Sequence, residues 1–167
     1  MKPLLILFTL LLITHSAEAD NTTKVAAVLD ALHAAASHSE SEAYFDLFSD
    51  EAIFIGTDVG EYWTLGQFKS YAMPSFKKGR GWTYIPRSRN IQFSNTGEIA
   101  WFHEILDNEH YGTTRGTGVL ILEKGKGWRI VQYHLTIPIP NDIATDLTDR
   151  IKSYEAAPGS HKGNPEE

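Results

Sequence analysis

The chain has 167 residues, a length typical of a single domain, and its formal net charge is −6. This negative balance argues against nucleic acid and anionic membrane surfaces as partners, because both favour a basic face. The chain contains no cysteine, which excludes disulfides, a cysteine nucleophile, a zinc–thiolate site and a lipoprotein anchor.

The first 19 residues have the features of a secretory signal. Lys2 precedes the apolar run "PLLILFTLLLI", which is short for a membrane span, and "AEA" at 17–19 is a small-x-small cleavage sequence. We therefore expect residues 1–19 to be removed on export and the protein to be periplasmic or secreted. An uncleaved membrane anchor is the alternative. An exported domain without disulfides is ordinary for a bacterial periplasm.

Two segments after the predicted cleavage site have the apolar spacing of amphipathic helices. The first begins at Thr22 or Thr23, either of which could cap it, and its apolar residues recur three and four positions apart. The second, over 37–48, begins with Ser39 and Glu42, which have the three-residue spacing of a capping box. Aromatic residues then supply its apolar face.

A short strand, "AIFIGTD", and a glycine-rich turn lead into a third predicted helix over 64–79. Thr64 and Gln67 have capping-box spacing at its start. Pro74 has no backbone N–H to donate, so it should kink or end this helix near its last turn.

From Gly81 onward the apolar period changes to two, which is typical of strands. Turns that contain "NTG", "HYG" and "KGKG" separate the segments, and turns this short allow only antiparallel neighbours. A further amphipathic helix is expected over 143–154. The sequence therefore predicts four consecutive antiparallel strands, over 82–94, 98–111, 113–125 and 127–140.

These elements predict an α+β fold, in which three N-terminal helices pack on one curved antiparallel sheet and enclose a cone-shaped cavity. The domain is expected to span residues 20–155. The tail over 156–167 is polar and rich in Pro and Gly, so we expect it to be disordered.

The order of elements resembles the nuclear transport factor 2-like superfamily, which includes ketosteroid isomerase and the SnoaL-like polyketide cyclases. The resemblance covers about residues 22–145 and implies a cone-shaped cavity and frequent dimers. It implies no particular reaction, because the superfamily hosts isomerases, cyclases, dehydratases, hydrolases and non-catalytic modules. Five motifs make the chain similar to small SnoaL-like domain proteins: "IFIGTDVGEYWT", "GRGWTY", "IAWFHEIL", "YGTTRGTGVL" and "GWRIVQYHLTIPIPND".

The central strands are apolar on both faces, as in "GVLIL" and "IAWFHEIL". An antiparallel sheet with one solvated face should instead alternate apolar and polar residues. We therefore expect one face to pack on the helices and line the cavity. The other face should be covered by a second subunit in a homodimer, because a large exposed apolar patch is unusual on a monomer.

Polar and aromatic side chains on these strands and turns are the candidates for a site. Asp58, Glu104 and His134 could act as acids or bases. Glu104 and Arg115 should lie opposite one another as an ion pair if the turn between them centres near residues 109 and 110. A carboxylate held by arginine stays ionised and is a poor general acid. Flat ligands could stack on Tyr62, Trp63, Trp82, Tyr84 or Trp101.

Each candidate also has a structural interpretation. Asp58 and Glu61 could serve the turn before the third helix, the aromatic residues could belong to the core, and His134 could be a hydrogen-bonded core histidine. Alternation along the last strand nevertheless predicts that His134 faces the cavity, unless a bulge reverses the pattern. The face that includes His134 has the polar groups that suit a cavity wall, and it carries Trp128, Ile130, Gln132, His134 and Thr136.

The sequence therefore supports two functions, a ligand-binding domain and an enzyme. The enzyme, which is the alternative, would be a cofactor-free isomerase, cyclase or dehydratase that uses His134, Glu104 and Asp58. No cofactor is expected, and no metal, because the histidines and carboxylates lack metal-ligand spacing. A buried carboxylate without a partner would favour the enzyme, and a fully paired set would favour binding. The first function is an exported domain that binds a small, largely apolar ligand through Tyr62, Trp63, Tyr84, Trp101, Arg115 and His134.

Overall fold

The computed structural model describes residues 4–157 and, within them, side chains from residue 19 onward. The predicted tail lies outside these residues from position 158. Most side chains of the predicted signal segment, up to position 18, also lie outside them. Among the described residues, no helix is both long and apolar enough to cross a membrane.

The first helix, α1 (Leu4–His38), is continuous, so the predicted start at Thr22 or Thr23 is wrong. The Thr23 hydroxyl does not cap a helix but donates to the carbonyl of Ala19, one turn earlier, at 3.1 Å. The predicted apolar stripe of this helix does face the core, and its buried members include Val25, Leu29, Leu32 and Ala36.

Ser39 ends α1 instead of beginning the next helix. Its φ is 60°, in the left-handed region that residues often adopt just after a helix C-terminus. The second helix, α2 (Ser41–Phe45), therefore starts later and has no side-chain cap, so the predicted capping box of Ser39 and Glu42 is wrong. The Ser39 hydroxyl instead accepts a hydrogen bond from the backbone N–H of Gly81 at 2.8 Å.

The third helix, α3 (Leu65–Phe76), begins as the sequence predicts. Thr64 accepts from the backbone N–H of Gln67, and the Gln67 side chain accepts from the backbone N–H of Thr64, which completes a capping box. Pro74 lies in the last turn, and the helix ends two residues later.

All the strands form one sheet, in the order β2-β1-β6-β5-β4-β3. The predicted four-stranded meander is confirmed as β3 to β6. The sequence does not predict β2, nor the parallel pairing of β1 with β6, which places the first strand beside the last. The strands are β1 (Phe48–Ile55), β2 (Tyr62–Thr64), β3 (Ile85–Phe93), β4 (Ile99–Asn108), β5 (Gly112–Glu123) and β6 (Gly127–Thr136).

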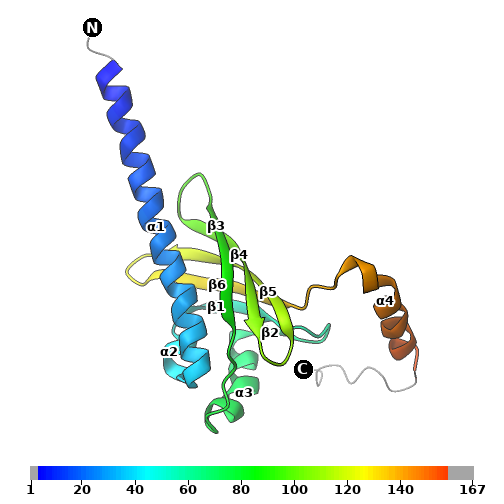
Figure 1. The fold of residues 1–167 in the computed structure, drawn as a ribbon. Helices are drawn as coiled ribbons and strands as arrows, with labels where there is room; N and C mark the ends of the chain where they lie inside the picture. The colour runs from blue at the N-terminus through cyan, green and yellow to red at the C-terminus, as the bar shows by residue number, and fades with distance from the viewer. Residues whose placement is uncertain (1–3, 158–167) are drawn as a thin grey trace.

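The helices α1, α2 and α3 gather on one face of the curved sheet, as Figure 1 shows, and the core lies between these two layers. The predicted α+β fold with a cone-shaped sheet is therefore confirmed. The last helix, α4 (Asn141–Glu155), follows the sheet and stands apart from it (Figure 1), with no buried residue. Its Ile143 and Tyr154 are exposed.

A one-residue bulge in β6 decides which of its side chains face inward. Val119 pairs with Gln132, whereas Leu120 pairs with Ile130, so the residue between the two partners, Val131, is extra. Ile130 and Tyr133 are consequently both buried although they are three positions apart. The strict alternation predicted from the sequence therefore fails from this point to the end of the strand.

Candidate functional site

A cavity of about 230 Å³ lies between the concave face of the sheet and the three packed helices. Its walls are mainly aromatic and come from both layers. Polar groups occur at its base and at its open end. The lining residues are Leu32, His33, Ala36, Tyr44, Phe54, Gly56, Thr57, Glu61, Trp63, Phe68, Tyr71, Trp82, Tyr84, Tyr111, Tyr133 and Leu135.

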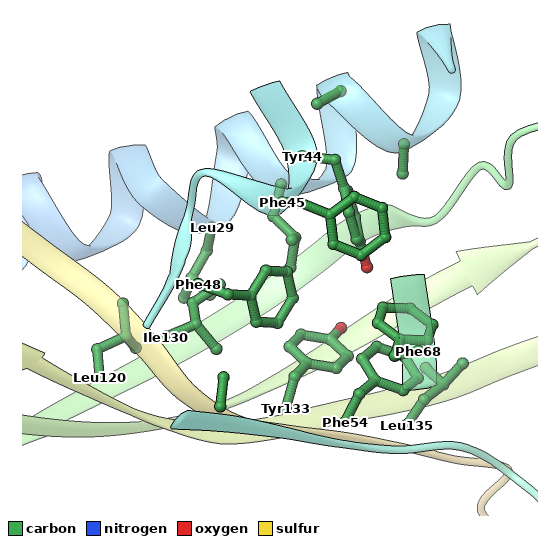
Figure 2. Packing of buried hydrophobic residues seen from close by; sticks show 14 of the residues in the cluster. Leu29, Tyr44, Phe45, Phe48, Phe54, Phe68, Leu120, Ile130, Tyr133 and Leu135 are labelled. Carbon is green, nitrogen blue, oxygen red and sulfur yellow. The ribbon is translucent and has the colours of Figure 1, made fainter. Parts of the chain in front are cut away.

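Stacked aromatic rings shape the apolar part of the cavity. The rings of Phe54 and Phe68 are parallel to within 9°, with centroids 3.7 Å apart, and Tyr133 stacks on Phe54 at 5.7 Å. Figure 2 shows Tyr44 on the helical side and Tyr133 on the sheet side of this cluster. Such rings lose little conformational freedom when a flat ligand binds between them.

Glu104 lies behind the cavity base and is completely buried. We call Glu104, His33, Arg89 and Tyr133 the Glu104 network. His33 Nε2 lies 2.8 Å from Glu104 Oε1, and the Tyr133 hydroxyl donates to the same oxygen at 3.2 Å. Arg89 Nε donates to Glu104 Oε2 at 2.8 Å. Both carboxylate oxygens of Glu104 therefore have partners, contributed by α1, β3 and β6.

Arg89 links the Glu104 network to the outside of α1. Its Nη1 donates to Asp30 Oδ1 at 2.7 Å and to the carbonyl of Ala26 at 3.2 Å. Burial by itself would lower the pKa of Arg89, but the hydrogen bonds and the charges of Asp30 and Glu104 outweigh this and raise it. Arg89 is thus a fixed positive charge that compensates the buried carboxylate.

Burial keeps two phenols beside the cavity, Tyr133 and Tyr44, protonated. Burial, together with the charge of Glu104, raises the pKa of Tyr133 well above its ordinary value. Burial also raises the pKa of Tyr44, whose hydroxyl forms a hydrogen bond with Trp82. Both groups therefore stay protonated at neutral pH.

Four polar residues surround the open end of the cavity: Glu61, Tyr71, Tyr84 and Tyr111, which we call the mouth. Tyr71 and Tyr111 are largely exposed, which marks this end as the entrance. Burial, followed by the charges of Tyr111 and Glu61, raises the pKa of Tyr84 to about 12.

Within the described residues, no group of three or more His, Asp or Glu side chains could hold a metal ion.

The structure brings together only some of the residues predicted for the site. Trp63 and Tyr84 line the cavity, and Glu104 lies directly behind it. Tyr62 is exposed. Asp58 serves its turn, since its carboxylate accepts from the backbone N–H of Gly60 at 2.8 Å.

Trp101 lies on the outer face of the sheet, away from the cavity. Its side chain is exposed, and its Nε1 donates to Gln92 at 2.7 Å. On the neighbouring strands, Val119 and Gln132 occupy the positions that continue the same outward-facing row. Trp101 is therefore not placed to stack on a ligand in the cavity.

The predicted pair of Glu104 and Arg115 is wrong. Glu104 pairs with Gly116 across the hairpin, and Arg115 lies opposite Ile105 on the outer face. The turn spans three residues, with Asn108 opposite Gly112, and Gly112 has a φ of 68°. This moves the register by one residue from the predicted one, and a one-residue shift exchanges the two faces of a strand.

The prediction that His134 faces the cavity is also wrong. His134 pairs with Thr117 and Ile55 on the outer face, whereas its neighbour Tyr133 is buried and lines the cavity. The bulge at Val131 is the reason, because it reverses the alternation between the start and the end of β6. Tyr133 therefore takes the inward place assigned to His134.

His33 and Arg89 are absent from the residues predicted for the site. A signal for His33 exists in the sequence, because it lies four positions after Leu29 on the predicted inward stripe of the first helix. Arg89 belongs to a strand whose side chains are mostly polar and exposed, and nothing in its local sequence distinguishes it from Arg87. Only the packed fold shows which of the two arginines reaches Glu104.

Residues 25–140 match the family model described as "SnoaL-like domain". No match is found among curated proteins. The chain is similar to a domain of unknown function with a cystatin-like fold from Nostoc punctiforme PCC 73102. In that comparison the TM-score is 0.62 and the identity 13%, over 84% of this chain and 88% of that chain.

Two further structures place the fold. A candidate dehydratase of the nuclear transport factor 2-like family from Streptomyces avermitilis has a TM-score of 0.60 and 10% identity, over 71% of this chain and 96% of that chain. A candidate ketosteroid isomerase from Shewanella frigidimarina NCIMB 400 has a TM-score of 0.52 and 21% identity, over 65% of this chain and 90% of that chain. These likenesses show a nuclear transport factor 2-like fold. Together with the match over residues 25–140, they establish that the chain belongs to the SnoaL-like domain family.

Proposed function

We propose that this protein is an exported SnoaL-like domain that binds a small, largely apolar ligand in its cavity and does not transform it. The observation that carries the proposal is the complete pairing of Glu104 with His33, Arg89 and Tyr133. Both carboxylate oxygens of Glu104 are occupied by these partners, so Glu104 is not free to exchange a proton with a ligand.

The groups that reach the cavity fit binding better than acid/base chemistry. Its walls are aromatic, and Glu104 itself does not line it. Tyr44 and Tyr133 are kept protonated by burial. The Tyr133 hydroxyl already donates its one hydrogen to Glu104, so it can only accept a hydrogen bond from a polar group of the ligand. A phenol that stays protonated at neutral pH cannot take a proton from a ligand.

The size of the cavity limits its ligand. A dry apolar cavity of ~150 Å³ holds benzene. At about 230 Å³, this cavity has room for a molecule of one or two rings. We therefore choose 2-naphthol, a neutral two-ring phenol, as a probe.

Isothermal titration calorimetry with 2-naphthol tests the proposal. Ala36 lines the cavity from α1, whereas Ala34 lies on the exposed side of the same helix. Ala36→Phe should fill the cavity and abolish binding, and Ala34→Phe should leave it unchanged. A thermal melt of each variant checks that it folds. Equal binding by the wild type and a folded Ala36→Phe variant would show that the probe binds elsewhere.

Acid/base catalysis is the second candidate, and one observation favours it. His33 lines the cavity and its Nε2 lies 2.8 Å from Glu104, which is the arrangement of a histidine oriented by a carboxylate. Native mass spectrometry of protein purified from its own host can identify a retained molecule. Binding predicts that the purified protein leaves this molecule unchanged on incubation. Conversion of the molecule by the wild type but not by His33→Gln would favour the enzyme.

Export rests on the apolar run and the "AEA" sequence before Asp20. The buried residues described in α1 begin at Val25, so cleavage after Ala19 would remove none of them. N-terminal analysis of the exported protein should therefore find Asp20 first. A protein that retains Met1 in the membrane fraction would contradict this part of the proposal.

A further inference from the structure

We propose that the ligand of this cavity is a small aromatic ammonium compound, whose rings fill the cavity while its positive group lies at the mouth. This inference rests on the proposed binding function and names its ligand class. Three observations carry it: an uncompensated carboxylate at the mouth, the way the chain fixes that carboxylate, and the aromatic rings around it.

Among the described residues that line the cavity, Glu61 is the one carboxylate, and none is a lysine or an arginine. In the described part of the chain, every ion pair that a lysine or arginine forms is with another carboxylate, and none is with Glu61. The charge of Glu104, in contrast, is compensated by Arg89. Of the described residues that line the cavity, Glu61 thus offers a ligand a negative charge that no lysine or arginine compensates.

The loop between β1 and β2 holds Glu61 in place. The backbone N–H of Gly56 donates to the carbonyl of Glu61 at 2.8 Å, and the backbone N–H of Asp58 donates to its carboxylate at 3.2 Å. Any Cβ at position 56 would collide with this carboxylate, so only glycine leaves room for it. Because the carboxylate is fixed before a ligand arrives, binding costs little additional ordering.

Aromatic rings surround the same end of the cavity. Tyr71, Tyr84 and Tyr111 line it, and the ring of Tyr71 stacks on Trp63 with centroids 4.6 Å apart. The faces of such rings attract cations, and a group of them beside a carboxylate suits an alkylated ammonium. Burial raises the pKa of both Tyr71 and Tyr84, and the charge of Glu61 adds to this, so these two phenols stay neutral beside the carboxylate of Glu61.

Two probes of nearly the same shape separate charge from size. Benzyltrimethylammonium is a cation, and 2,2-dimethylpropylbenzene is its neutral counterpart, with carbon in place of nitrogen. Calorimetric titrations are made with the wild type, Glu61→Gln, and Glu98→Gln as a matched control. Glu98 is exposed in the turn between β3 and β4, at the opposite end of β4 from Tyr111, and its substitution removes the same charge.

Glu61→Gln should weaken binding of benzyltrimethylammonium about tenfold, which corresponds to ~1.4 kcal/mol, and change binding of the neutral probe less than twofold. Glu98→Gln should change neither. Glutamine can still accept from the N–H of Asp58, so the loop should keep its conformation. Tyr71→Leu should likewise weaken binding of the cation more than binding of the neutral probe.

Two other outcomes would overturn the inference in different ways. If Glu61→Gln weakens binding of both probes equally, or of neither probe, the proposed ligand class is wrong, although the cavity still binds apolar molecules. If the wild type binds neither probe, nor 2-naphthol, the inference fails together with the proposed function.

Discussion

Glu104 joins a helix and two strands in the interior of this protein. It is completely buried, and its partners come from a helix and two strands that are distant in the sequence. A buried charge of this kind is stable only while its partners remain, because the lost hydration must be replaced by nearby charges and donors. The Glu104 network therefore ties α1 to the sheet.

Arg89→Ala should lower the free energy of unfolding by ~3–5 kcal/mol, because it leaves Glu104 buried without a positive charge. Arg87→Ala is the matched control on the same strand. Arg87 pairs with Asp107, and both side chains are 49% exposed. The loss of this pair should therefore lower the free energy of unfolding by only ~0–1 kcal/mol. Urea denaturation measures both. Equal effects of the two substitutions would show that the Glu104 network does not stabilise the fold.

Arg115→Ala should behave like an ordinary surface substitution, within about 0.5 kcal/mol of the wild type in urea denaturation. Arg115 is exposed on the outer face, opposite Ile105, and does not reach Glu104. A loss of several kcal/mol would instead indicate the pair that the sequence predicts, and with it a different register for β4 and β5.

Tyr133 should make the stability depend on alkaline pH. Its pKa in the folded protein lies well above the ordinary 10.0, so the unfolded chain releases this proton first. The stabilisation is complete below pH 10 and is lost as the pH rises from about 10 toward the folded pKa. Tyr133→Phe should therefore make the decline in unfolding free energy shallower by up to ~1.4 kcal/mol per pH unit. Urea denaturation at pH 9, 10 and 11 measures these slopes.

The matched control for this experiment is Tyr154→Phe, since Tyr154 is exposed on α4. It should keep the slope of the wild type. A Tyr133→Phe variant with the same slope as the wild type would contradict the buried, hydrogen-bonded position of this phenol.

Strand β5 depends on glycines that make room for neighbouring groups. A Cβ on Gly118 would collide with the carbonyl oxygen of Gln132, beside the bulge of β6. Gly118→Ala should therefore destabilise the protein by ~1–3 kcal/mol, through forced movement of a packed backbone. Gly66→Ala is the control, because no atom lies near its missing Cβ in α3, and it should stabilise by ~0.5–1 kcal/mol.

Thermal or urea unfolding of the two variants gives the comparison. If Gly118→Ala is as stable as Gly66→Ala, then β5 and β6 do not approach as closely as described. That result would also place the bulge elsewhere in β6.

The type and order of most elements are predictable from sequence, whereas the faces of the strands are not. The capping box of Thr64 and Gln67 and the period-two segments after Gly81 are local signals, and the structure confirms them. A strand face depends on counting residues in pairs, so one additional residue reverses the result. Single additional residues in the turn before Gly112 and at Val131 were enough to misplace Arg115 and His134.

The partners of Glu104 could not be found locally either. His33 is 71 positions away and Arg89 is 15, and the contact of each follows from how α1 and β3 pack against β4. The parallel pairing of β1 with β6 is equally non-local. This pairing places the first strand of the chain beside the last one, so β6, which carries Tyr133, has β1 as a neighbour.

At the scale of the whole molecule, we propose that the outer face of the sheet associates with a second copy in a homodimer. Ile99 and Trp101 are each 43% exposed on this face, and Val119 and Ile121 are only partly covered. Light scattering should give a dimer mass at micromolar concentration, and Ile121→Glu should give a folded monomer, because it places a charge in the apolar contact. A monomeric wild type would contradict this proposal.

An NMR titration of the 15N-labelled protein with 2-naphthol can show whether the cavity between the sheet and the three packed helices is the binding site. Saturable shifts are expected at backbone amides around the cavity, above all at Ala36, Tyr44, Tyr84 and Tyr133, with little change at Trp101 and His134 on the outer face. Shifts centred on Trp101 and His134, or no saturable shifts at all, would contradict the account.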